Sequence, residues 1–132
     1  MNRSAHVQIE STRHHVTWRW AGELWMGGPE WGWISINGGA EQSAGSPEVV
    51  WAADESFMAF VSLKVDDVPN RKGTEGMGFR IGLVRMSDGA IRYCLGNVGF
   101  ADIRLSTMSA DSIEAVVDGK VRTIPANNIS WE

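Results

Sequence analysis

The chain has 132 residues, of which 43% are hydrophobic and 21% charged, and its formal net charge at pH 7 is −4. This composition indicates a single globular domain over residues 1–132 and excludes an intrinsically disordered chain. The acidic balance disfavours nucleic acid as a partner, because nucleic-acid binding needs a basic surface. One cysteine, Cys94, cannot form an internal disulfide. No apolar run approaches the ~18 residues of a membrane span, and no signal peptide is visible, so we expect a cytoplasmic protein without a membrane partner.

The first part of the chain alternates apolar and polar residues, which is the period of a β-strand. Within residues 15–20, Trp18 and Trp20 fall on one face of the expected strand. In the strand that follows, Trp31 and Trp33 share a face. The elements expected here are strands at 6–10, 15–20 and 31–36, with a Gly- and Pro-rich turn at 26–30.

The middle of the chain changes from small polar residues to a long apolar run. We expect a loop from Ala40 to Pro47, because its residues are small and polar. A short strand follows at 49–51. Residues 57–65 are almost entirely apolar, which is typical of a central strand covered on both faces. A buried helix is the alternative, but the β-branched and aromatic content favours a strand.

The second half of the chain predicts two β-hairpins. Asp118 and Gly119 supply the positive-φ residues that a type I′ turn requires. The segment Ser87–Gly89 is the other expected hairpin turn. The strands expected in this half are residues 79–86, 90–95, 101–107, 112–117 and 120–124.

Together these elements predict an all-β fold. We expect an antiparallel meander of about eight to ten short strands, forming a sandwich, an open barrel or blade-like curved sheets. Residues 46–60 resemble one blade motif of TolB-like β-propellers, through Trp51, Asp54, Ala59 and Phe60. A closed propeller needs at least four blades of ~40 residues, and this chain has room for three. The resemblance therefore implies blade-like antiparallel sheets and not a propeller.

The whole chain also resembles small, Trp-rich, all-β bacterial immunity proteins that are encoded beside secreted toxins. The resemblance rests on the size of the chain, on the segments Trp31–Gly38 and Val49–Ser56, and on the lack of catalytic motifs. It implies a cytoplasmic inhibitor that binds one secreted toxin or effector domain and occludes its active site, as a monomer or homodimer.

No residue pattern predicts catalysis, a cofactor or a metal. His14 and His15 are adjacent on an expected strand and point to opposite faces, so they cannot easily hold one metal ion. Cys94 lies in a strand-like run, where a thiol acts as a small hydrophobic residue. The glycine-rich segment Gly73–Gly78 lacks the Gly-Lys-Ser/Thr ending of a phosphate-binding loop.

Seven tryptophans are the most informative feature of the sequence. An indole is costly to leave in water and hard to bury without a partner for its N–H group. We expect Trp18 and Trp20 to face inward, with Trp31 and Trp33 opposing them across a hairpin. Trp25 precedes a Gly-Gly turn, where we expect an exposed ring.

Two pairs of acids occur in turn-like segments, Asp54–Glu55 and Asp66–Asp67. Acid/base catalysis needs two carboxylates in different environments that face a cleft. We interpret these pairs as solvated turn residues, or as an acidic rim that meets basic residues of a partner.

The sequence therefore predicts a non-enzymatic binding protein. A carbohydrate-binding module and a small enzyme with dispersed acids are the alternatives. A deep cleft with convergent acids or histidines would favour an enzyme, and a flat or convex face bearing Trp would favour an inhibitor. The expected partner-binding residues are Trp25, Glu30, Trp31, Trp33, Asp54, Glu55, Asp66 and Asp67.

Overall fold

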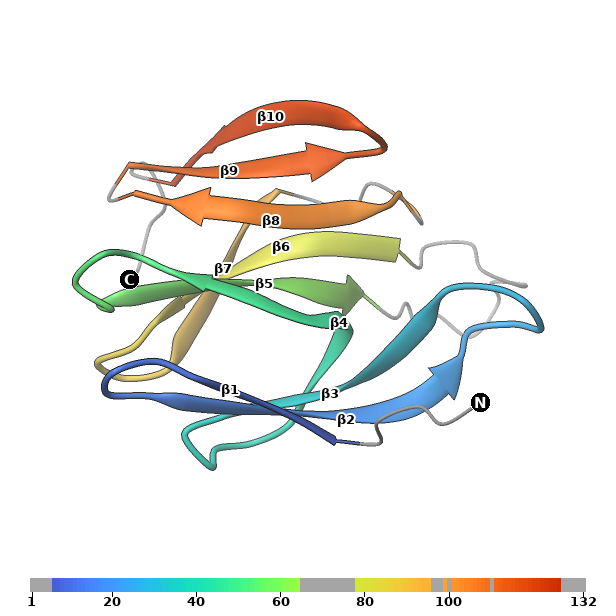
Figure 1. The fold of residues 1–132 in the computed structure, drawn as a ribbon, viewed down its shortest axis with the longest axis horizontal. Coiled ribbons are helices and arrows are strands. Elements are labelled where there is room, and N and C mark those ends of the chain that lie inside the picture. Colours follow the sequence, from blue (N-terminus) through green and yellow to red (C-terminus); the bar gives the residue numbers. More distant parts are fainter. Residues whose placement is uncertain (1–5, 65–77, 96–98, 100, 110, 127–132) are drawn as a thin grey trace.

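The computed structural model describes residues 6–64, 78–95, 99, 101–109 and 111–126. In these ranges the chain forms a seven-stranded sheet in the order β1-β2-β3-β4-β5-β6-β7 and a three-stranded sheet in the order β10-β9-β8 (Figure 1). All pairs are antiparallel, and within each sheet every strand pairs with the strand that follows it in sequence, so the expected meander is confirmed. The strands are β1 (His6–Glu10), β2 (His15–Glu23), β3 (Glu30–Ile36), β4 (Gln42–Trp51), β5 (Phe57–Lys64), β6 (Gly78–Arg85), β7 (Ala90–Leu95), β8 (Ile103–Met108), β9 (Ser112–Val117) and β10 (Lys120–Pro125).

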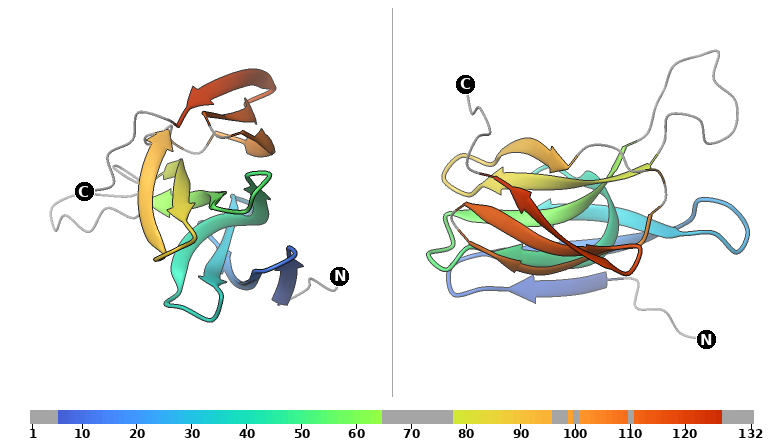
Figure 2. Two further views of the ribbon diagram at one scale, coloured as in Figure 1. Left: turned by 90° about the vertical axis from the view of Figure 1, so that its left-hand side faces the viewer. Right: turned by 90° about the horizontal axis from the view of Figure 1, so that it is seen from above.

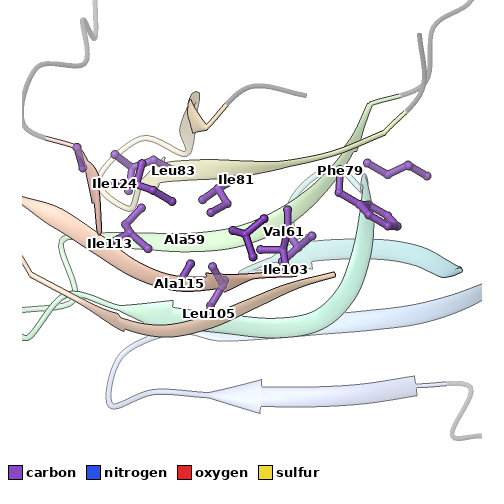
Figure 3. Close-up of a cluster of buried hydrophobic side chains, with 13 residues drawn as sticks. Ala59, Val61, Phe79, Ile81, Leu83, Ile103, Leu105, Ile113, Ala115 and Ile124 are labelled. Carbon is purple, nitrogen blue, oxygen red and sulfur yellow. The ribbon is translucent and has the colours of Figure 1, made fainter. Parts of the chain in front are cut away.

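The three-stranded sheet packs against one face of the larger sheet (Figure 2). Alternate residues of β5, namely Ala59, Val61 and Leu63, enter the core between the two sheets, as the period of a strand requires. The same core receives alternate residues of β6, β8 and β9, several of which are shown in Figure 3. The buried members are Ala59, Val61, Leu63, Phe79, Ile81, Leu83, Ile103, Leu105, Ile113, Ala115, Val117, Ile124 and Ala126.

A second core lies on the opposite face of the larger sheet, which curves strongly (Figure 2). Met58 and Phe60 of β5 point into it, so β5 is covered on both faces, as its apolar run predicts. Among the described residues β1 and β7 do not pair, so the sheet stays open and does not close into a barrel. The buried members of this core are Val16, Trp18, Ile34, Ala44, Met58, Phe60 and Val84.

The loop expected from Ala40 to Pro47 is wrong from Gln42 onward, because β4 begins there. Ala44 is fully buried and pairs with both neighbouring strands. The small residues that suggest a loop are instead needed because this strand packs closely against its neighbours. A Cβ atom at Gly45 would come within 2.6 Å of the Phe79 ring. Composition alone cannot distinguish a solvated loop from a strand that lies close to an aromatic ring.

β4 carries a large bulge that matters for the surface described below. Its pairing with β5 stops at Ala44 and resumes at Val49, so the segment 45–48 lies opposite a single residue of β5, Val61. The bulge carries Glu48 towards β8, where its carboxylate accepts a hydrogen bond from the Leu105 backbone N–H. β8 is an edge strand of the small sheet, so this bond satisfies a backbone donor that none of the described strands pairs with.

None of the described residues belongs to a helix that could span a membrane.

Candidate functional site

The hairpin between β2 and β3 projects beyond the ends of the other described strands (Figures 1 and 2). Its connection exposes two large hydrophobic side chains, Trp25 at 43% and Met26 at 99%. The other large hydrophobic residues exposed in the described part of the chain, Tyr93 and Val121, lie on β7 and β10. Exposed apolar residues gathered on a projecting element are typical of an interaction site.

The tip of this hairpin is ordered by its own hydrogen bonds. The Leu24 N–H donates to the Pro29 carbonyl at 2.8 Å, and the Gly28 N–H donates to the Trp25 carbonyl at 2.8 Å. The Gly27 N–H donates to the Glu23 carboxylate at 2.9 Å, and Gly27 adopts a φ of 73°, which favours glycine. The exposed side chains are therefore presented by a defined turn, as a preorganised binding element requires.

Trp18 faces inward, as expected, but the expectation that Trp31 and Trp33 oppose Trp18 and Trp20 across the hairpin is wrong, because Trp31 and Trp33 lie on the other face of the sheet. The register pairs Trp18 with Ile34 and Trp20 with Gly32, and Trp31 and Trp33 alternate with these two residues of β3, so both point to the opposite face. They contact each other edge to face, with ring centroids 5.0 Å apart, and both are half-buried. Trp31 packs against the core between the sheets. Arg19, which pairs with Trp33, is ion-paired with a glutamate, Glu41, at 2.9 Å.

Burial of Trp18 depends on Gly32. A Cβ atom at Gly32 would come within 2.6 Å of the Trp18 ring, so only glycine leaves room for the indole. The indole N–H groups of Trp18 and Trp51 are buried and have no hydrogen-bond partner in the described part of the chain. A buried donor of this kind costs about 1–3 kcal/mol, so these rings contribute through apolar packing.

Asp54 and Glu55 lie in the turn between β4 and β5, at the opposite end of the molecule from the β2–β3 tip (Figure 1). The Glu55 carboxylate accepts hydrogen bonds from Ser11 Oγ at 2.6 Å, from Arg13 N at 3.2 Å and from Thr12 N at 3.3 Å. The Ser11 bond, ahead of the backbone donors, lowers the pKa of Glu55. These hydrogen bonds connect Glu55 to the turn between β1 and β2 and stabilise that turn.

Asp54 is likewise engaged within its own turn. Its Oδ1 accepts bonds from the Ser56 hydroxyl at 2.6 Å and the Ser56 backbone N–H at 3.0 Å, and the hydroxyl bond is the main reason that the pKa of Asp54 is lowered. Asp66 and Asp67 lie outside the described residues. Of the predicted acids that the structure describes, only Glu30 lies close to the hairpin tip.

Glu30 lines a hollow of about 540 Å³ at the base of the hairpin. The hollow lies between the start of β3, the bulge of β4 and the start of β8. Sequence reasoning missed three of its charged residues, Glu48, Asp102 and Arg104. No sequence signal marks them, because only the bulge and the packing of the small sheet bring them to one place. The lining is Pro29, Glu30, Gly45, Ser46, Pro47, Glu48, Val61, Phe79, Ala101, Asp102, Ile103 and Arg104.

The residues considered for nucleophilic or metal chemistry are not gathered at this hollow. Cys94 is half-buried, and burial raises the pKa of its thiol to about 11, so little thiolate forms at neutral pH. The His14 ring lies 3.0 Å from the Asn37 side-chain amide, while His15 is exposed. Among the described residues no group of three or more His, Cys, Asp or Glu could hold a metal ion.

In comparisons with protein-family models, curated proteins and solved structures, no significant match to this chain was found.

Proposed function

We propose that this chain is a non-enzymatic binding protein that uses the tip of the β2–β3 hairpin as its anchor. The observation that carries the proposal is the exposure of Trp25 and Met26 on a projecting and ordered turn. An aromatic ring and a flexible thioether that enter a partner's cleft gain hydrophobic contact at a small cost in ordering, because the turn is already formed. Tryptophan is among the residues that most often dominate the binding energy of protein interfaces.

The charge around the tip supports a basic partner cleft. Glu23 and Glu30 are exposed and lie opposite each other in the backbone register at the base of the hairpin. The formal net charge of the whole chain is −4. Carboxylates beside an apolar anchor steer the encounter and select for basic surfaces. The sequence resemblance to immunity proteins supplies the partner's class. We propose a secreted bacterial toxin domain, neutralised in the cytoplasm by occlusion of its active site.

The state of the acids supports binding over catalysis. Glu48 accepts a hydrogen bond from the Leu105 N–H, and Asp102 is ion-paired with Arg104 at 3.0 Å. Both carboxylates thus have structural partners, whereas a catalytic pair needs groups poised to exchange protons with a substrate. A carbohydrate-binding module would also expose a Trp beside glycine, and the test below separates it from the inhibitor.

The test is isothermal titration calorimetry with the protein encoded next to this chain's own gene. We expect sub-micromolar binding that Trp25→Ala weakens about 30-fold or more, the equivalent of ~2 kcal/mol for a central anchor residue. Met26→Ser is expected to weaken binding in the same direction. Val121→Ser is the matched control, because Val121 is 69% exposed but lies on β10. It should bind as the wild type does.

Two outcomes would overturn the proposal. The first is the absence of sub-micromolar binding to the neighbouring gene product, or binding that is equally strong with alanine at position 25. The second is glycan-array binding that Trp25→Ala abolishes, which would establish the carbohydrate-binding alternative.

A further inference from the structure

We infer that the hollow at the base of the β2–β3 hairpin is a pocket for a lysine or arginine side chain of the protein partner. The identity of the molecule that supplies this side chain rests on the proposed function. The shape and chemistry of the pocket do not, because they follow from the residues that line it.

The floor of the pocket is rigid and apolar. Val61, Phe79 and Ile103 are all at least nine-tenths buried and belong to the core between the two sheets. Figure 3 shows these three side chains together at one end of that core. A cavity of about 540 Å³ with such a floor is large enough for a long side chain and offers its methylene groups apolar contact.

The walls come from two proline-containing segments. Pro29 belongs to the hairpin connection, and Pro47 lies in the bulge of β4. Proline has no backbone N–H group, so these wall positions offer no main-chain donor to an anion. The bond from the Leu105 N–H to Glu48 fixes the bulge against β8 and keeps this side of the pocket in place.

The rim is negative. Three carboxylates, those of Glu30, Glu48 and Asp102, line the pocket together with the single guanidinium of Arg104. Among the described lining residues the net charge is therefore −2, from three negative groups and one positive group. Arg104 is ion-paired with Asp102 at 3.0 Å and also interacts electrostatically with Glu48, so one guanidinium faces more than one carboxylate at this rim.

An apolar floor under an acidic rim selects a particular ligand chemistry, that of an aliphatic stem with a cationic end. Lysine and arginine have this form, since their stems can be buried while the charged group stays at the rim. A protein partner is the source that the geometry favours. Pro29 and Glu30 belong to the same hairpin as Trp25 and Met26, so a chain seated on the tip also lies beside the pocket.

The first experiment needs no partner protein. The ¹⁵N-labelled full chain is titrated with Nα-acetyl-lysine methylamide and Nα-acetyl-arginine methylamide, and with the uncharged norleucine analogue as a matched probe. We expect saturable amide shifts around Val61, Ile103 and Glu48, with a dissociation constant on the order of 1 mM for at least one basic probe. Norleucine should bind at least 10-fold more weakly. Equal binding of norleucine, or no saturation with either basic probe, overturns the inference.

Two substitutions then test which carboxylate binds the basic probe. Glu30→Gln is chosen because Glu30 is exposed, so the fold does not depend on its burial. It should weaken binding of the basic probe about threefold or more. Glu114→Gln, on the exposed face of β9, is the matched control and should bind as the wild type does. Ala101→Met fills the pocket with a longer side chain and should also weaken binding of the basic probe. If Glu30→Gln and Ala101→Met both bind the probe as the wild type does, the assignment is overturned.

The two proposals fail separately. Trp25→Ala should leave the basic probe's affinity unchanged while it weakens the complex with the neighbouring gene product. If the probe binds but the chain forms no complex with the neighbouring gene product, the proposal of the pocket stands and the proposed function is wrong. If a tight complex forms but the probe does not bind, the proposed function stands and the proposal of the pocket is wrong.

Discussion

The indole of Trp25 lies directly over Gly28, so closely that a Cβ atom at Gly28 would come within 2.5 Å of Trp25 Cε2. The glycine therefore determines where the exposed ring of the hairpin tip lies. The ring and the hydrogen bond from the Gly28 N–H to the Trp25 carbonyl form one small unit at the end of β2. The tip thus has a defined surface before any partner arrives.

Gly28→Ala should displace the Trp25 ring. The added methyl group occupies the space of the indole, so we expect a large shift of one indole N–H signal in the ¹H–¹⁵N spectrum. Partner affinity should fall about 10-fold, because the anchor no longer has its preorganised position. The control is Gly89→Ala, whose φ of 77° strains the turn but whose Cβ meets no atom within 4 Å. An unmoved indole signal in Gly28→Ala would contradict the prediction.

Gly82→Ala should destabilise the second core. A Cβ atom at Gly82 would come within 2.6 Å of the Phe60 ring, which is fully buried. Overpacking of this kind costs about 1–3 kcal/mol, and urea unfolding measures it. Phe60→Leu in the same chain should recover part of the loss, because a smaller side chain makes room for the methyl group. Additive effects of the two substitutions would show that the ring and the glycine do not compete for the same space.

Glu48→Ala should loosen the contact between β4 and β8. The substitution leaves the Leu105 N–H without its acceptor, which costs about 1–3 kcal/mol when the donor is buried. Hydrogen exchange should report faster exchange of the Leu105 amide. Glu48→Gln keeps one acceptor oxygen and should lose less stability. Glu114→Ala, exposed on β9, should change stability by less than ~0.5 kcal/mol. Unchanged protection of Leu105 in Glu48→Ala would exclude the bridging role.

Glu55 should make the fold sensitive to acid. The hydrogen bond from Ser11 lowers the pKa of Glu55 below its ordinary value of 4.5. A depressed pKa in the folded state stabilises the fold above the unfolded pKa, and this contribution is lost as the pH falls through the folded pKa. The Tm difference between the wild type and Glu55→Gln should therefore be largest near pH 7 and shrink below pH 4.5. Glu114→Gln is the control, and a Tm difference for Glu55→Gln that does not change with pH would rule out this linkage.

Periodicity was a reliable guide wherever side chains alternate between two environments. The alternation in β2 predicts that Trp18 faces inward, and its burial confirms it. The Asp118–Gly119 turn is also confirmed, since both residues adopt positive φ values, 50° and 80°. These features depend on neighbours in sequence, so local chemistry is enough to predict them.

The candidate site was predicted only in part, because its residues come from distant segments. Trp25 is exposed beside its Gly-Gly turn, as expected. Asp54 and Glu55 hold turns at the other end of the molecule, and nothing in their own sequence names Ser11 as a partner. The carboxylate of Glu48 was overlooked, since it directly follows the segment 40–47, whose composition suggests a loop.

The sequence by itself determined an antiparallel meander with two-residue alternation, its hairpin turns and an exposed indole next to glycine, because each depends on residues within one strand or turn. Only the tertiary structure decided that the segment around Gly45 is a bulged strand, and that Glu30, Glu48 and Asp102 surround one apolar hollow. The physical reason is that the bulge, the buried Phe79 ring and the edge of β8 must fit one another in space, and no local pattern records that fit.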